Sequence, residues 1–189
     1  LRYWRKKLTN VLLPYVVCSM PAIIVFTMVT HREEMRRGFY EQPVWRQMLE
    51  FLATGWHLAP LWFIPTILLF FLAAPIWIWA FRDRRAFLVL PLLFVIPIFV
   101  ARGAHQPLQS FVHFTPLWVL GMATHRFSSQ FEKAMRFGLF PALLMVSAAC
   151  LALELTVVDV THTFYSYLGK AVFSLAMLEM FRRLGDRAT

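Results

Sequence analysis

Two charged side chains stand inside long apolar stretches of the sequence, where a charge is costly unless it has a function or a partner. Glu154 lies about one turn from the end of one such stretch, and Lys170 lies about two turns into the next. If these stretches form adjacent antiparallel helices, the two side chains can meet. A charge in such a place marks either a polar functional site or a structural ion pair between the helices. The sequence leaves both interpretations open.

Four histidines fall near the same ends of the predicted helices, and histidine is the side chain best suited to proton transfer near neutral pH. They are His57, His105, His113 and His162. No pair of them has the short spacing of metal-ligating histidines, so we predict no metal site. His113 alone lies within an apolar stretch, which makes it the candidate for a catalytic base. The alternative for each is a solvated histidine without a catalytic role.

Basic residues gather in short clusters between the apolar stretches. Arg5, Lys6 and Lys7 form the first cluster, and further clusters follow residues 81, 125 and 181. Arg and Lys side chains bind phosphate groups, which points to a polyanionic cofactor. The same residues need no ligand if they mark the cytoplasmic loops of a membrane protein. No glycine-rich phosphate loop, nucleophile elbow or His-Glu-x-x-His motif accompanies them.

Membrane-spanning helices are the elements that must position these residues. The stretch 58–81 holds no charged residue and, at about 1.5 Å rise per residue, is long enough to cross a hydrocarbon layer of about 30 Å. The chain is 59% hydrophobic and 15% charged, whereas soluble domains are about 25% charged. This excess of apolar side chains predicts an all-α, polytopic membrane helical bundle that forms a single transmembrane domain over residues 1–189.

Six spans can be drawn from the apolar stretches. The third is the shortest and carries Pro91 and Pro97, whose freed carbonyls neighbouring helices would have to satisfy. Basic residues concentrate in alternate connections, so the positive-inside rule supports six crossings and places both termini in the cytoplasm. The predicted spans cover residues 8–29, 58–81, 86–101, 107–124, 137–158 and 164–181.

Charge and cysteine content argue against other classes of protein. A net charge of +9 would suggest nucleic acid as the partner of a soluble protein, but here the basic residues follow the predicted topology. Cys18 and Cys150 both lie within apolar stretches, so neither a disulfide framework nor a zinc site is predicted. The partner that the composition itself indicates is the lipid bilayer.

The long connection 30–57 contains an element of its own, a helix that we predict over residues 43–53. Pro43 is suited to the first helical position. Arg46 and Glu50 are spaced to form an ion pair on the polar face. Apolar side chains recur on the other face: Trp45, Met48, Leu49 and Leu52. This pattern predicts an interfacial helix on the outer surface of the membrane.

Three stretches carry motifs of a known family. The opening, YWRKKLTNVLLPYVV, leads from a basic run into a Pro-Tyr pair at Pro14. The stretch APLWFIPTILLFFLAAPIW contains a Leu-Trp-Phe triplet that starts at Leu61, and SFVHFTPLWVLGMATHRF contains a Gly-Met pair at Gly121 before a basic loop. In order and spacing, over most of the chain, these stretches resemble the acyltransferase 3 family, integral membrane enzymes that O-acylate sugars and other surface polymers.

The chain departs from the family pattern at several points. Asn10 and Pro60 stand where the family has a basic residue and a histidine. Family members have more spans, and the helix that carries the arginine and histidine central to acyl transfer would precede Leu1. The last family helices would follow Thr189. The resemblance therefore implies a partial chain of the acyltransferase scaffold, and we expect this chain alone to lack acyl-transfer activity.

The function that the resemblance implies is transfer of an acyl group from acyl-CoA, such as acetyl-CoA, to a hydroxyl of a carbohydrate or cell-envelope polymer. The implied location is the bacterial inner membrane, with the donor on the cytoplasmic side. Arg5, Lys6 and Lys7 would contact the phosphates of the donor. A histidine would activate the acceptor hydroxyl on the outer side.

Two other hypotheses stay open. The chain is suited to a small six-span transporter or channel subunit in which Glu154, Lys170 and His113 line a polar path. It is also suited to a membrane scaffold without catalytic activity.

Overall fold

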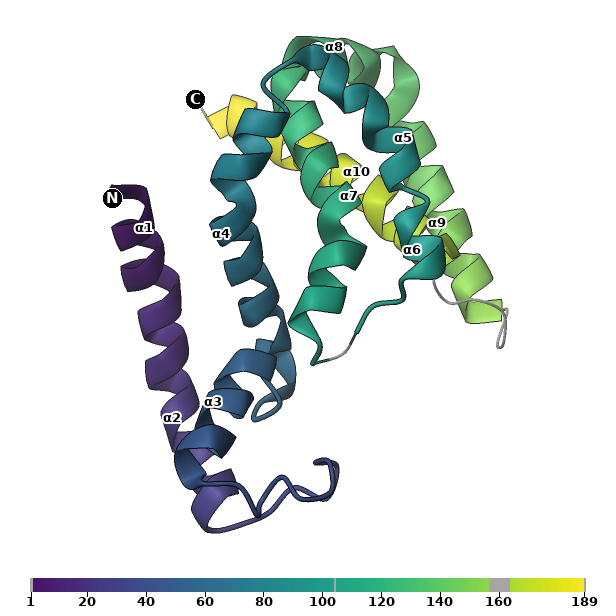
Figure 1. The fold of residues 1–189 in the computed structure, drawn as a ribbon. Coiled ribbons are helices and arrows are strands. Elements are labelled where there is room, and N and C mark those ends of the chain that lie inside the picture. Colours follow the sequence, from purple (N-terminus) through teal and green to yellow (C-terminus); the bar gives the residue numbers. More distant parts are fainter. Residues whose placement is uncertain (1, 104, 157–163, 189) are drawn as a thin grey trace. The chain divides into compact units, whose positions relative to one another are not determined.

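The fold is helical throughout the part of the chain that the structure, a computed structural model, describes: residues 2–103, 105–156 and 164–188 (Figure 1). These residues contain no strand. The all-α prediction is therefore confirmed. In apolar stretches of this kind, helices satisfy the backbone donors and acceptors within the segment itself.

Two compact units make up the chain. Unit 1 comprises residues 1–82 and 103–112, and unit 2 comprises residues 83–102 and 113–189. The segment that we predicted as the third span thus belongs with the C-terminal half of the chain rather than with the helix that precedes it. A single transmembrane domain over the whole chain stays a prediction.

Unit 1 begins with one continuous apolar helix. Its three parts are α1 (Arg2–Lys7), a π-helical turn η1 (Leu8–Leu12) and α2 (Leu13–Met28). The helix is 26 residues long from Tyr3 to Met28, and only 22% of its most apolar window is buried. This degree of exposure differs from that of a core helix in a soluble protein, which would be mostly buried.

The second long apolar helix of unit 1 is α4 (Phe63–Ala80), which follows a 3-10 turn η2 (Ala59–Trp62). It contains 18 residues, so it starts later than the stretch 58–81 predicted. Among the described residues, this helix and the first one are the two that are long and apolar enough to cross a membrane. The other four predicted spans do not reach that length and hydropathy.

A small hydrophobic cluster closes one end of unit 1. Helix α3 (Val44–Thr54) packs against α2 (Figure 1) and buries Phe51 together with Ile23 and Phe39. The Tyr15 hydroxyl on α2 donates a hydrogen bond to the Leu52 carbonyl at 2.7 Å, which ties the two helices together. The predicted helix over residues 43–53 is confirmed to within one residue at each end.

Details of α3 differ from the prediction. Pro43 precedes the helix instead of opening it. Glu50 pairs with Arg36 at 2.8 Å and not with Arg46, because the preceding loop brings the Arg36 guanidinium alongside the helix. Arg46 lies instead over the ring of Trp45. The predicted Arg46–Glu50 pair is therefore wrong.

The apolar side chains predicted on one face of α3 lie in two different environments. Met48 and Leu52 pack against the hydrophobic cluster. Trp45 and Leu49 are exposed, as an interfacial helix on a membrane surface would require.

The third predicted span is not confirmed. Residues 86–101 form short helical pieces rather than one continuous helix. Pro97 has no amide hydrogen, and in a continuous helix its ring would collide with the carbonyl of Leu93 four residues earlier, so the helix stops and restarts. The pieces are η3 (Arg84–Val89), α5 (Leu90–Leu93) and α6 (Ile96–Phe99).

The remaining predicted spans of unit 2 are helical but are not candidate membrane spans by length and hydropathy. Helix α7 carries polar side chains along its length, α9 has 17 residues, and α10 continues past residue 181 into a charged end. These helices are α7 (Pro107–Arg126), α8 (Ser128–Ala134), α9 (Phe140–Thr156) and α10 (Phe164–Ala188), with a π-helical turn η4 (Met135–Leu139) before α9. The six-span bundle therefore stays a prediction.

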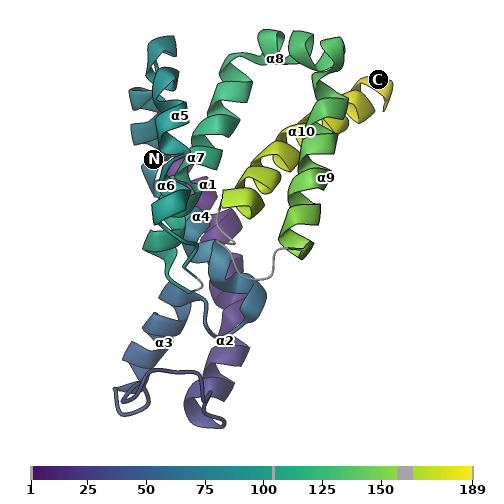
Figure 2. The same ribbon diagram turned by 90° about the vertical axis from the view of Figure 1, so that its right-hand side faces the viewer.

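Helices α9 and α10 pack side by side, as Figure 2 shows. They approach closely at Gly169, where an added Cβ would lie 2.9 Å from the Cβ of Cys150. The Ser147 hydroxyl donates a hydrogen bond to the Gly169 carbonyl at 3.5 Å. Small side chains at such a contact let two helix backbones come near each other, as is common between helices in membranes.

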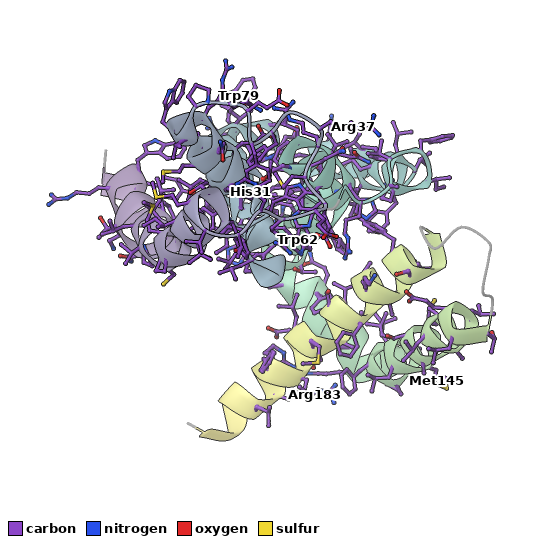
Figure 3. All side chains as sticks on the ribbon, turned by 90° about the horizontal axis from the view of Figure 1, so that it is seen from below. His31, Arg37, Trp62, Trp79, Met145 and Arg183 are labelled. Carbon is purple, nitrogen blue, oxygen red and sulfur yellow. The ribbon has the colours of Figure 1, made fainter. Side chains whose placement is uncertain are left out.

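Large apolar side chains cover the outside of both units. Trp79 on α4 is 77% exposed, and Met145 on α9 is 69% exposed and projects away from α10 (Figure 3). Water-soluble proteins seldom expose large contiguous apolar patches, and lipid is the surrounding in which such side chains cost nothing.

Gly55 ends α3, and we predict that Gly55→Ala destabilises unit 1. Gly55 has a left-handed φ of 73°, and an added Cβ would lie 2.5 Å from the Trp62 Cα. The combined strain and overlap should lower stability by about 1–3 kcal/mol, measured by unfolding in detergent. Gly38→Ala is the matched control, because Gly38 shares the left-handed φ but has its nearest neighbour at 3.6 Å. Equal losses in the two variants would contradict the role given to the Trp62 contact.

Candidate functional site

A polar cavity of about 350 Å³ lies within unit 2. Three predicted site residues meet at it, each from a different helix: His113 from α7, Glu154 from α9 and Lys170 from α10. The rest of the lining consists of Ala101, Arg102, Phe114, Ser166 and Tyr167. A cavity with several ionisable groups among apolar helices is where binding or chemistry is expected.

His113 is buried, and a backbone carbonyl fixes its tautomer. Its Nδ1 lies 2.7 Å from the carbonyl oxygen of Val100. Because a carbonyl can only accept a hydrogen bond, Nδ1 carries the hydrogen and the lone pair of the neutral ring lies on Nε2. Val100 follows the end of α6 in an extended conformation, so its carbonyl lies beyond the regular helix. A ring anchored at Nδ1, with Nε2 as the proton acceptor, has the arrangement of a general base.

Aromatic rings hold the His113 side chain in place. Tyr167 meets it edge to face, with ring centroids 4.9 Å apart. Phe94 packs in turn against Tyr167 with centroids 5.9 Å apart. Tyr167 is buried, so this wall of the cavity is formed by well-packed rings rather than by mobile surface side chains. Such packing preorganises a catalytic or binding side chain.

Glu154 and Lys170 share the cavity but do not form the structural ion pair that was one interpretation of the sequence. Among the described residues, no salt bridge joins them. The Lys170 ammonium donates instead to the Ser166 hydroxyl at 2.5 Å, one turn earlier on α10. Both Glu154 and Lys170 are exposed, so their charges are accessible to a ligand in the cavity. The arrangement favours the interpretation as a polar site.

Two of the other predicted histidines belong to unit 1. These are His57, whose ring is buried, and His105, whose ring stacks on Trp56 at 4.0 Å. His162 lies outside the described residues. Within the described part of the chain, no group of His, Cys, Asp and Glu is placed to hold a metal ion.

The first basic cluster divides into two kinds of side chain. Arg5 and Lys6 are exposed. The Lys7 ammonium lies 4.0 Å from the ring centroid of Phe71 on α4 and 5.8 Å from that of Tyr3, so it makes cation–π contacts within unit 1. Only the first two are therefore displayed for a phosphate group. The sequence alone did not distinguish them from Lys7.

The basic cluster after residue 181 is partly neutralised within unit 2. Glu179 is fully buried, and its carboxylate accepts hydrogen bonds from Arg182 at 2.8 and 2.9 Å and from Arg183 at 2.6 Å. Arg183 also lies over the ring of Phe140. Both guanidinium groups thus neutralise Glu179, and Arg183 (Figure 3) also joins the end of α10 to the start of α9.

Sequence reasoning missed part of the cavity. Ser166 is spaced one turn from Lys170 on the same helix, and that spacing was a usable signal. Arg102 stands out as the basic residue in the connection before α7. The Val100 carbonyl had no sequence signal, because its position depends on the residue at which α6 ends, Phe99.

Comparison with protein families, with curated proteins and with solved structures finds no match to this chain. The resemblance to the acyltransferase family therefore rests on the three sequence stretches alone, and a functional assignment has to be argued from the cavity.

We predict that acidification destabilises unit 1 through His57. Burial lowers the pKa of His57 below its ordinary value of about 6.5. The hydrogen bond to the Phe51 carbonyl raises this pKa by a smaller amount, and the Arg32 guanidinium lowers it further. The unfolded chain then binds a proton that the folded chain rejects. This contribution to stability is full above about pH 6.5 and is lost as the pH falls toward the lowered folded value.

The measurement is thermal unfolding in detergent as a function of pH. His57→Asn keeps a donor for the Phe51 carbonyl and removes the titrating ring, so its stability should fall less on acidification than that of the wild type. His125→Asn, at an exposed position, should behave as the wild type does. A wild-type protein that gains stability as the pH drops through this window would contradict the burial argument.

Proposed function

We propose that this chain is part of an integral membrane O-acyltransferase, which transfers an acyl group from acyl-CoA to a hydroxyl of a carbohydrate or cell-envelope polymer. The observation that carries the proposal is the state of His113 at the polar cavity. Its Nδ1 is held by the Val100 carbonyl, and its Nε2 is left to accept a proton. The three sequence stretches that resemble the acyltransferase 3 family support the acyltransferase assignment, and the role of His113 rests on the cavity alone, because the family's histidine has no counterpart among these stretches.

A membrane location is part of the proposal. The two long helices of unit 1 and the exposed apolar side chains of both units suit a lipid environment. We propose the bacterial inner membrane, with the basic clusters on the cytoplasmic side. Six crossings would require α7, the α9–α10 pair and the broken segment before α7 to lie at membrane depth against other helices.

The reaction would use His113 as the base for the acceptor. Nε2 takes the proton of the acceptor hydroxyl as its oxygen attacks the thioester carbonyl of acyl-CoA. The carbon–sulfur bond then breaks, the acyl ester remains on the acceptor, and the CoA thiolate takes the proton back from the imidazolium. A base of this kind typically contributes a factor of about 100 to 10,000 in rate. In unit 1, the exposed side chains of Arg5 and Lys6 stay separate candidates for binding a phosphate group.

A second candidate function is a transporter or channel subunit. The observation that favours it is that Glu154 and Lys170 line the cavity together with His113 and are both exposed. Ionisable residues on facing helices mark ion and substrate paths in membrane proteins. The two functions differ in what the cavity must do, because an enzyme turns over its ligand and a transporter releases it unchanged.

We predict that His113→Asn lowers the rate of acyl transfer by about 100-fold or more. The asparagine amide can still donate to the Val100 carbonyl, so the melting temperature should change little while the base is lost. The assay uses the protein encoded by the native reading frame in membranes, with labelled acetyl-CoA and envelope carbohydrate. His125→Asn is the matched control. A fully active His113→Asn variant would rule out this histidine as the base.

The transporter hypothesis predicts solute flux that depends on the charged pair. In reconstituted vesicles, Glu154→Ala and Lys170→Ala should each abolish the flux of a charged solute, while Lys133→Ala, on α8, should leave it intact. If solute flux depends on Glu154 and Lys170 and no CoA-dependent acyl transfer is found, the chain would be assigned as a transporter and not as an acyltransferase. Neither flux nor transfer would favour the scaffold.

A further inference from the structure

The cavity of unit 2 carries an excess of positive charge. Among the described residues, its lining holds two basic side chains, Arg102 and Lys170, against one carboxylate, Glu154, so basic side chains outnumber acidic ones by one. A ligand with a negative group would be attracted to the cavity, and a second cation would be repelled.

Lys170 has donor capacity left for such a group. An ammonium carries three donors, and its one side-chain partner among the described residues is the Ser166 hydroxyl at 2.5 Å. A carboxylate or phosphate in the cavity would form charge-assisted hydrogen bonds with the remaining donors of this ammonium.

We infer that the cavity recognises its substrate by an anionic group, a carboxylate or a phosphate, bound at Lys170 and Ser166. Resting on the proposed acyl transfer, this makes the acceptor an acidic carbohydrate, whose charged group binds at Lys170 while a hydroxyl reaches His113. Glu154 repels the charged group from the α9 side and accepts a hydrogen bond from a neutral hydroxyl, so the lining also orients the acceptor.

The first experiment measures anion binding without any reaction. The thermal stability of the protein in a non-ionic detergent is followed as inorganic phosphate or acetate replaces chloride at constant ionic strength. The wild type and the control Lys133→Gln should be stabilised. Lys170→Gln should bind at least about tenfold more weakly, and Lys170→Arg, which keeps the charge, should retain binding. Equal stabilisation of the wild type and Lys170→Gln, or none in the wild type, would overturn the inference.

The second experiment separates the acceptor from a lipid headgroup, which has the same phosphate chemistry. The phosphate titration is repeated in vesicles of phosphatidylcholine with and without phosphatidylglycerol. An undiminished phosphate effect in both supports a soluble or polymer-borne anion. Loss of the phosphate effect when phosphatidylglycerol is present would assign the site to lipid and overturn the acidic acceptor.

The third experiment compares acidic and neutral saccharides as acceptors. Lys170→Gln should raise the KM for the acidic acceptor at least about tenfold and leave that for a neutral one unchanged. Transfer to neutral saccharides alone, unaffected by Lys170→Gln, would overturn the inference and keep the proposed function. Lys170-dependent phosphate binding in a protein that transfers no acyl group would overturn the proposed function and keep the anion site.

Discussion

In an apolar chain, every backbone amide and carbonyl has to find a partner within the protein, and this constraint determines where the helices of this chain start and stop. Proline is the residue that disturbs it. Pro97 removes a donor and breaks the segment that would otherwise span from residue 86 to 101. Helix α6 ends at Phe99, and the Val100 carbonyl lies beyond this end, where the His113 ring donates to it. The end of α6 thus orients the candidate base.

The close packing of α9 against α10 forms the other side of the cavity. Gly169 on α10 lets that helix approach Cys150 on α9, and the pair of helices carries Lys170 and Glu154 to a common lining. At this separation the two charges face a shared space without forming a salt bridge. A buried ion pair between Glu154 and Lys170 would hold α9 and α10 together and leave neither charged group available to a ligand. Without this ion pair, the charges of Glu154 and Lys170 both stay available to a ligand. The charge of the Lys170 ammonium is then compensated only by a group that enters the cavity.

Much of this was predictable from the sequence, and the reasons for the failures are physical. Long uncharged stretches predict helices well, and charges within them predicted Glu154, Lys170 and His113 as site residues, which the structure brings together. The third span is not confirmed, because residues 86–101 form short helical pieces, and a proline in an apolar helix is tolerated only where neighbouring helices satisfy its freed carbonyls. The Arg46–Glu50 pair failed because a local pair is worth only about 0.3–0.5 kcal/mol, so a partner from a loop, Arg36, displaces it.

The π-helical turn η1 sets the rotational phase between the two ends of the first helix. A π turn holds one residue more than the α-helical turn that it replaces, and successive residues of an α-helix are rotated by about 100°. Deleting one residue from Leu8–Leu12 would therefore restore an α-helical turn and keep both the Lys7–Phe71 contact and the Tyr15–Leu52 hydrogen bond, whereas winding the same residues as a regular α-helix would turn Lys7 by about 100° relative to Tyr15. The relative directions of the side chains before and after η1 thus depend on the one extra residue that the π turn contains.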